Sequence, residues 1–490
     1  MNHNHDKPKS PRPGQVTTVL LMLFALGCAS VGPDYRPPAP DAPAKWHNGG
    51  AAVTAARDNK QLAEWWTVFD DPLLTRLVGM ALEENLDLKK AKAAVREARA
   101  SRGAAQAGLF PTATGSAAAT RSRSSENNGS GDTDDLFSLG FDASWELDVF
   151  GGVRRAVEAA EADLGAAEAD LRDVLASLTA ELGTNYIEAR SRQARLAAAE
   201  QSLVSLGETV DLTQARFQTG LDDELAVLQA GYNREDAAAD IPTHKTALEQ
   251  AFNRLAVLTG RKPGELRDLL AEVKPIPAAP AAASIGPPAE TLRQRPDIRK
   301  AERELAAQTA RIGEAAADLY PKFKLAGSLS LEALQAHKLL RVESLASSLG
   351  PSVSWNIFDA GLIRRNIEVQ TAKQEQCLAA YEAAVLTALE EVENALVAFD
   401  QEQKRREKIR RAADLASQAE GLARQQYLAG LKDFSDVLET QRQLLTYRDQ
   451  LAQSDAAVAG DLVTLYKALG GGWARSDDQR VDSLYITEGR

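Results

Sequence analysis

Apolar and polar residues alternate strictly over residues 137–149, a run that begins Phe-Ser-Leu-Gly-Phe-Asp. Shorter runs with the same period lie at 323–331 and 352–357. A period of two predicts β-strands that have one apolar and one polar face. Strands of about ten residues with this pattern suit a transmembrane barrel with lipid outside and water inside. A half-buried sheet on a soluble core would show the same alternation, so the pattern alone leaves both structures open.

Long segments without proline follow the predicted strands, at 153–241 and from residue 362 to the C-terminus. They are rich in Ala, Glu, Gln, Arg and Leu, which favour helices. A helix over 155–217 would be roughly 90 Å long at about 1.5 Å per residue. Gly220 and Gly430 each follow an aromatic residue by three positions and are expected to be helix C-caps that turn the chain back. Each segment therefore predicts a long helical hairpin.

The two halves of the chain are related by a constant offset of 210 residues, which places Trp145 on Trp355. Tryptophan occurs only six times, so this coincidence together with the matches around it indicates a true repeat, covering about 86–260 and 296–470. The offset also aligns Leu109-Phe110-Pro111 with Leu319-Tyr320-Pro321, Gly151 with Gly361, Arg154-Arg155 with Arg364-Arg365, and Phe217-x-x-Gly220 with Tyr427-x-x-Gly430.

Each repeat contains two predicted strands, which gives four per chain. Four strands cannot close a barrel, because even a small barrel needs about eight. Open sheet edges are not tolerated in lipid, since their N–H and C=O groups would lack hydrogen-bond partners. If the strands enter a membrane, the barrel must therefore be shared between several copies of the chain.

The N-terminus has the pattern of a secretory leader. Three basic residues among the first 15 are followed by the apolar run 16–26 and then by Gly27-Cys28. A cysteine at this place indicates a bacterial lipoprotein, in which the leader is removed before the cysteine and the thiol is acylated. We therefore predict lipidation of Cys28, with Ala29 permitting transport to the outer membrane. An ordinary leader with a chance cysteine is the alternative.

Composition and charge exclude several classes of function. The formal net charge is −12, and an acidic chain repels phosphate backbones, so we expect no nucleic-acid partner. No later apolar window of about twenty residues predicts a membrane-spanning helix. Beyond the leader the histidines are scattered, and the sequence contains no phosphate-binding loop, zinc spacing or nucleophile elbow. We therefore expect no catalytic residue, no metal and no cofactor, and we interpret Cys377 as a buried free thiol.

A lipid-anchored periplasmic adaptor or a coiled-coil scaffold is the alternative, but neither needs amphipathic strands between its helices.

Five sequence blocks distributed over nearly the whole mature chain point to one family. They are Cys28 with the following Val-Gly-Pro-Asp-Tyr-Arg-Pro-Pro, Trp65-Trp66 with Phe69 and Asp71, Arg295-Pro296-Asp297 with the following Ile-Arg-Lys-Ala-Glu, Tyr320-Pro321-Lys322-Phe323, and Tyr466 to Trp473. Together these blocks resemble the outer-membrane factors, the TolC-like outer-membrane efflux proteins, and in particular their lipoprotein branch. Each block alone would be a weak indication.

The resemblance implies a mixed membrane α/β fold. Three chains would form one trimeric 12-stranded transmembrane β-barrel, with four strands per chain, continued by a long periplasmic α-helical barrel. The resemblance also implies the function, an outer-membrane channel subunit of a tripartite efflux or secretion system and not an enzyme. A periplasmic adaptor (membrane fusion) protein and an inner-membrane pump of the resistance-nodulation-division type would be its partners, beside outer-membrane lipid.

These patterns divide the chain as follows. Residues 1–27 are the lipoprotein signal peptide and 28–72 a lipid-anchored N-terminal segment. The first repeat is 73–273, with strands over about 112–149 and a helical hairpin over about 153–260. A Pro/Ala-rich linker at 274–289 leads to the second repeat, 290–473, with strands over about 322–358 and a hairpin over about 362–470. Residues 474–490 are a C-terminal tail.

The resemblance also places a periplasmic gate at the turn of the second hairpin. In the family, carboxylates six and nine residues after the turn glycine ring the aperture, and here these are Asp436 and Glu439. Lys432 and Tyr427 would take part in the closing network. The first-repeat turn departs from this pattern, so its gate partners stay open. Alternatively, the two carboxylates only stabilise the first turn of their helix through its dipole, or through a pair with Arg442.

Overall fold

The computed structural model describes residues 30–39, 42–49, 53–54 and 62–473. Cys28, the leader and the tail 474–490 lie outside the described residues. The chain divides into two compact units. The first comprises Ala94–Ala167 and Lys300–Tyr381 with the described residues up to Pro38, and the second comprises the remaining segments. Each unit is described by itself below.

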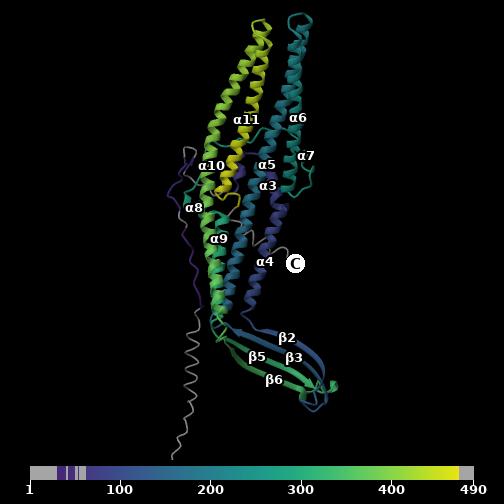
Figure 1. Ribbon diagram of the computed structural model, residues 1–490, viewed down its shortest axis with the longest axis vertical. Helices are drawn as coiled ribbons and strands as arrows, with labels where there is room; N and C mark the ends of the chain where they lie inside the picture. The colour runs from purple at the N-terminus through teal and green to yellow at the C-terminus, as the bar shows by residue number, and fades with distance from the viewer. Residues whose placement is uncertain (1–29, 40–41, 50–52, 55–61, 474–490) are drawn as a thin grey trace, which may run out of the picture. The chain divides into compact units, whose positions relative to one another are not determined.

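The first unit contains a four-stranded antiparallel sheet in the order β2-β3-β5-β6 (Figure 1). Its strands are β2 (Thr112–Arg123), β3 (Thr133–Leu147), β5 (Lys322–Ala333) and β6 (Leu345–Ser354). Adjacent strands in this order are hydrogen-bonded over ten to twelve residue pairs, and β2 and β6 form the two edges. One strand pair comes from each repeat, and the central β3–β5 contact joins the two repeats.

The strand register explains the alternation seen in the sequence. On one face Leu139 lies opposite Leu331, and Trp145 lies opposite Leu325. On the other face Glu146 lies opposite Lys324, and their side chains form an ion pair of 3.6 Å. Because side chains alternate along a strand, this register gathers apolar residues on one face and polar residues on the other. Many of the apolar side chains are exposed in the single chain, with Phe141 at 68%.

Two tryptophans of the repeat make the same contact. The indole Nε1 of Trp145 donates to the carbonyl of Leu109 (2.9 Å), and that of Trp355 donates to the carbonyl of Leu319 (3.0 Å). Both acceptors lie just after a helix and just before a strand. The sequence pattern extended the fourth strand to Ile357, but β6 ends at Ser354, because the chain leaves the sheet to enter the next helix.

The segment that follows the predicted lipid anchor lies against the first unit. The guanidinium of Arg155 donates to the carbonyl of Val31 (3.1 Å) and pairs with Asp34 (2.7 Å). Tyr35 donates its hydroxyl to Glu302 at 3.2 Å. The first described residues are thus held by side chains from both repeats.

Apart from a short parallel pair of strands, β1 (Val53–Thr54) and β4 (Ala283–Ser284), the other regular elements are helices (Figure 1). Four build the two predicted hairpins: α5 (Gly152–Gln218), α6 (Glu224–Leu258), α10 (Leu362–Leu428) and α11 (Phe434–Ala468). The others are α3 (Pro72–Glu84), α4 (Leu86–Ala107), α7 (Arg267–Leu270), α8 (Pro288–Gln294) and α9 (Pro296–Ala317). Within the described ranges, no helix is both long enough and apolar enough to cross a bilayer. Cys377, on α10, is a free thiol that is half-buried, so the expectation of a buried thiol holds only in part.

The helical segment that begins each repeat is divided into two helices by a single residue. Asn85 separates α3 from α4: its Oδ1 accepts the N–H of Leu88, and its Nδ2 donates to the carbonyl of Leu258, each at 2.9 Å. Arg295 separates α8 from α9, because the residue before a proline is disfavoured in the helical conformation. The Arg295 side chain is buried and pairs with Asp297 and Glu391.

The core of the second unit joins the N-terminal and C-terminal sequence blocks. Trp65 is fully buried and stacks on Tyr466, with ring centroids 6.2 Å apart. The indole also lies against Gly183 of α5, where an added Cβ would lie 2.5 Å from the ring. A larger residue at 183 would therefore displace the tryptophan.

Candidate gate at the hairpin tips

Both helical hairpins turn through the same backbone motif. After α5, the N–H of Gly220 donates to the carbonyl of Phe217 and that of Leu221 to Arg216. After α10, the N–H of Gly430 donates to Tyr427 and that of the next residue to Gln426. The two glycines have φ values of +74° and +72°, in the left-handed region that glycine adopts without steric cost. The two turns are therefore copies of one C-cap, as their offset of 210 residues predicts.

An apolar cluster packs the two hairpins together near these turns. All four long helices contribute to it, and its centre is Tyr427, whose ring lies 5.5 Å from that of Phe434. The buried members are Ala226, Ala230, Ala423, Tyr427, Phe434, Val437 and Leu438. Burying the ring of Tyr427, which is 2% exposed, brings its hydroxyl group to the first hairpin.

The polar end of Tyr427 joins the second hairpin to the first. Its hydroxyl donates a hydrogen bond to the carboxylate of Asp222, in the first-repeat turn. Arg216 donates to the same carboxylate oxygen at 2.9 Å, and its guanidinium lies 4.5 Å from the centre of the Tyr427 ring. The side chains of Arg216 and Asp222 are only 18% and 12% exposed. Asp222 therefore receives two donors, one from each hairpin, in a site with little water.

Burial raises the pKa of the Tyr427 phenol well above its ordinary value, and the neighbouring Asp222 carboxylate raises it further. The hydrogen bond from Arg216 to Asp222 in turn raises the pKa of the guanidinium. Both donors are protonated at neutral pH, as the hydrogen bonds to Asp222 require.

The other residues predicted for the gate make local contacts. Lys432 pairs with Asp436 at 3.3 Å, and Arg442 pairs with Glu439 at 3.7 Å. These side chains are between 44% and 59% exposed, so the pairs are weak in water. Within one chain, the structure thus brings Tyr427 to the first hairpin and leaves the carboxylates of Asp436 and Glu439 near the surface of α11.

Two residues of this contact were missed by reasoning from the sequence. The gate partners of the first turn were left open at the level of the sequence, and neither Asp222 nor Arg216 was singled out. The offset of 210 contains a signal for both, because it pairs Asp222 with Lys432 and Arg216 with Gln426. The charge at these positions therefore differs between the repeats.

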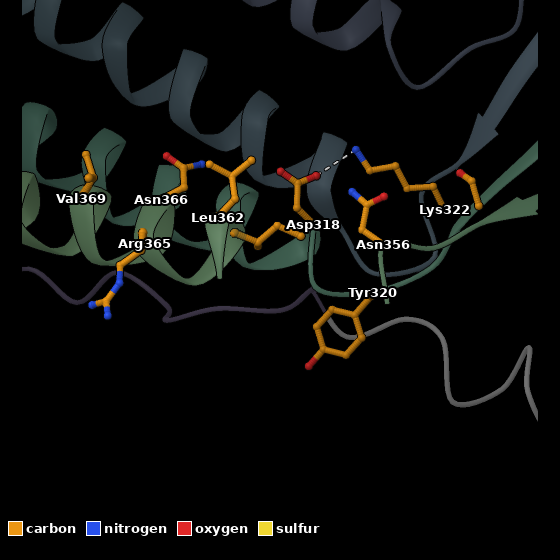
Figure 2. A pocket seen from close by; sticks show the side chains of 10 residues that line it. Asp318, Tyr320, Lys322, Asn356, Leu362, Arg365, Asn366 and Val369 are labelled. Atoms are coloured by element: carbon orange, nitrogen blue, oxygen red, sulfur yellow. Dashed lines mark ion pairs between the residues drawn. The ribbon is translucent and has the colours of Figure 1, made fainter. Parts of the chain in front are cut away.

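A separate hollow of about 570 Å³ lies in the first unit, beside the edge strand β6 (Figure 2). Residues from the end of α9, from the ends of β5 and β6 and from the start of α10 line it. Asp318 and Lys322 form an ion pair of 2.8 Å within it, while Leu362 is 72% and Val369 49% exposed. The hollow therefore continues an apolar surface beside an unpaired strand. Among the described residues, no group of His, Cys, Asp or Glu side chains is arranged to hold a metal ion.

Comparisons with known proteins agree with this architecture. The family model described as "Outer membrane efflux protein" matches residues 77–261 and 288–471, which are the two repeats. Nodulation protein T of Rhizobium leguminosarum bv. trifolii is 33% identical, over 93% of this chain and 97% of its own. The solvent efflux pump outer membrane protein SrpC of Pseudomonas putida is 32% identical, over 94% of this chain and 98% of its own. The solved outer-membrane channel OprN is 37% identical, with a TM-score of 0.86, over 90% of this chain and 99% of that channel.

These matches confirm the family, fold and function that were predicted from the sequence. The chain has the fold of the TolC-like outer-membrane channels, in which a small sheet and long helices are one subunit's share of the duct. It is a protein of the outer membrane and serves efflux as a conduit, not as an enzyme. The chain belongs to the outer membrane efflux protein family.

Proposed function

We propose that this chain forms a homotrimeric exit duct whose periplasmic end is closed by the contact between Tyr427, Asp222 and Arg216. In this proposal the sheet contributes four of twelve barrel strands. Support for a shared barrel comes from the unpaired edges β2 and β6, because an open edge cannot persist in lipid. The exposed apolar side chains around the hollow beside β6 would be covered by a second copy.

The main support for the proposed gate is the hydrogen bond from Tyr427 to Asp222. It links the hairpin of the second repeat to that of the first, so the two hairpins cannot separate while it holds. A periplasmic adaptor and an inner-membrane pump, which we take to be of the resistance-nodulation-division type, would complete the path and open the tips. Lys432 would add to the closed state by holding Asp436 in place.

Threefold symmetry would bring Asp436 and Glu439 of each chain towards one axis. Six carboxylates around a narrow aperture attract cations and repel anions. We therefore infer a nearly closed resting channel that prefers cations. The competing role, stabilisation of the α11 N-terminus by nearby acids, requires no such preference.

Lipidation of Cys28 would anchor the chain next to the barrel. The fixed course of residues 31–35 along the first unit suits such an anchor, since Arg155 binds this segment only a few residues after Cys28. The relatives named above include a nodulation protein and a solvent efflux protein, so similar chains serve different roles. We therefore propose that the pump selects the substrate and the duct does not.

The proposal as a whole is tested by reconstituting the purified protein in planar bilayers. We expect a low resting conductance that rises when the Tyr427 hydroxyl is removed, from a species that migrates as a heat-sensitive trimer in SDS. A wild-type protein that is monomeric, or that conducts as a permanently open pore, would contradict the proposal.

A further inference from the structure

The loop between β5 and β6, residues 334–344, is a compact structure of its own. Two short 3-10 turns shape it, Ala336–Lys338 and Val342–Ser344. The N–H of Arg341 donates to the carbonyl of Lys338 (3.1 Å), which also accepts from the hydroxyl of Ser344 (2.8 Å). The loop therefore satisfies much of its backbone internally, and its side chains are free to contact something else.

Large apolar side chains cover this loop without being buried by the chain. Leu334 is 64%, Leu340 80% and Val342 85% exposed. The surface continues onto the sheet, because Leu345 is 55% exposed and lies opposite Leu331 on the apolar face. Apolar side chains left in water forgo the free energy of burial, so a concentration of them at one loop indicates a covered surface.

Two basic side chains lie among these apolar ones. Lys338 and Arg341 are exposed, and neither takes part in an ion pair with any described residue. The corresponding loop of the first repeat, residues 124–132, is different. It consists of Ser, Asn, Gly, Asp and Glu residues and has no exposed large apolar side chain. The loop 334–344 also carries one exposed acid, Glu343, so its formal charge is +2 − 1 = +1. Its basic and apolar character is not shared by the loop of the first repeat.

We propose that the loop 334–344 docks into the outer leaflet of the membrane, with Leu340 and Val342 at the headgroup boundary and Lys338 and Arg341 on lipid phosphate groups. Apolar side chains flanked by bases are the chemistry of segments that lie in an anionic lipid interface. The inference uses one part of the proposed function: the strand ends far from the helices must lie on the outer side of the outer membrane. Besides the lipid phosphates, a neighbouring copy of the chain also has an acidic surface, its loop 124–132. That loop could match the two charges, but it has no apolar side chains to cover Leu340 and Val342.

The test places an environment-sensitive fluorophore on a cysteine at position 340 of the full-length protein. Cys377→Ser removes the free thiol of α10, the predicted acylation blocks Cys28, and Leu340→Cys provides the site. Ser130→Cys, on the loop of the first repeat, is the matched control. Each protein is reconstituted in phosphatidylcholine vesicles with and without lipid A, and quenching by neutral acrylamide reports exposure to water. Heat-sensitive trimer and conductance are measured on the same samples.

We expect acrylamide quenching at 340 to fall when lipid A is present, while quenching at 130 stays unchanged. Each base next to an anionic surface shifts insertion roughly fivefold. Neutralising both, by Lys338→Gln with Arg341→Gln, should therefore weaken the protection by roughly 25-fold in the insertion equilibrium. Equal quenching at 340 and 130 in lipid A vesicles, with trimer and conductance intact, overturns this inference alone. Protection at 340 that is already complete in detergent trimers also overturns it, since a neighbouring subunit would then cover the loop.

Discussion

Replacing Tyr427 by Phe removes one hydroxyl group from the contact between the two hairpins and leaves the rest of the side chain in place. The ring is 2% exposed and packs on Phe434, and phenylalanine preserves this packing. A hydrogen bond to a charged group contributes about 1.5–3 kcal/mol. The Asp222 carboxylate keeps its ion pair with Arg216 after the substitution, so it is not left without a partner. We therefore expect the lower end of this range for each contact, roughly tenfold in the equilibrium between joined and separated hairpins.

Three such contacts would act in the proposed trimer, so the effect on the aperture should exceed that on one hairpin pair. Single-channel recording in planar bilayers should show a higher resting open probability for Tyr427→Phe than for the wild type. Tyr232→Phe is the matched control, because Tyr232 is 56% exposed on α6 and its hydroxyl has no hydrogen bond to any described residue. Asp222→Asn should also open the channel, since it removes the charge that both donors share. Unchanged resting conductance in Tyr427→Phe and Asp222→Asn would refute the gate.

Three further predictions concern the aperture, the anchor and the sheet. Neutralising Asp436 and Glu439 together should reduce the preference for cations in reversal-potential measurements; an unchanged preference assigns both carboxylates to helix stability. Mass spectrometry of the mature N-terminus should find an acylated Cys28, and a free thiol there, or cleavage elsewhere, would contradict the lipoprotein leader. Leu139→Arg should lower the yield of assembled trimer, because arginine on a lipid-facing surface costs about 2–4 kcal/mol at the midplane and less towards the interfaces. Ser138→Arg, one residue away on the polar face, should be milder, and equal tolerance at both positions would indicate a soluble sheet.

Sequence reasoning reached the fold because the relevant signals are local and occur twice. Alternation along β3 fixes which side chains share a face, and it excludes any register in which an apolar residue such as Leu139 would face a polar one. The pairing of Leu139 with Leu331 is one of the registers that it allows. The break between α8 and α9 has a local signal, because the residue before Pro296 is disfavoured in a helix. The break at Asn85 has only the weak local signal of an asparagine N-cap, and its amide also donates to a carbonyl 173 residues away. Contacts over such distances depend on packing and are not encoded in any short pattern.

The same distinction explains which part of the gate was predicted. Each hairpin turn needs a residue with positive φ, and the sequence has a glycine at that position in both repeats. The proposed gate contact runs in one direction only. Tyr427 donates to Asp222, whereas their repeat equivalents, Phe217 and Lys432, have no hydroxyl and the opposite charge. Departures from the duplication at these positions therefore decide which hairpin donates and which accepts. The basic, apolar loop 334–344 is a second such departure, at the opposite end of its strands from the helices. In a repeat protein of this kind, positions where equivalent residues differ in charge or polarity are therefore the first places to look for function.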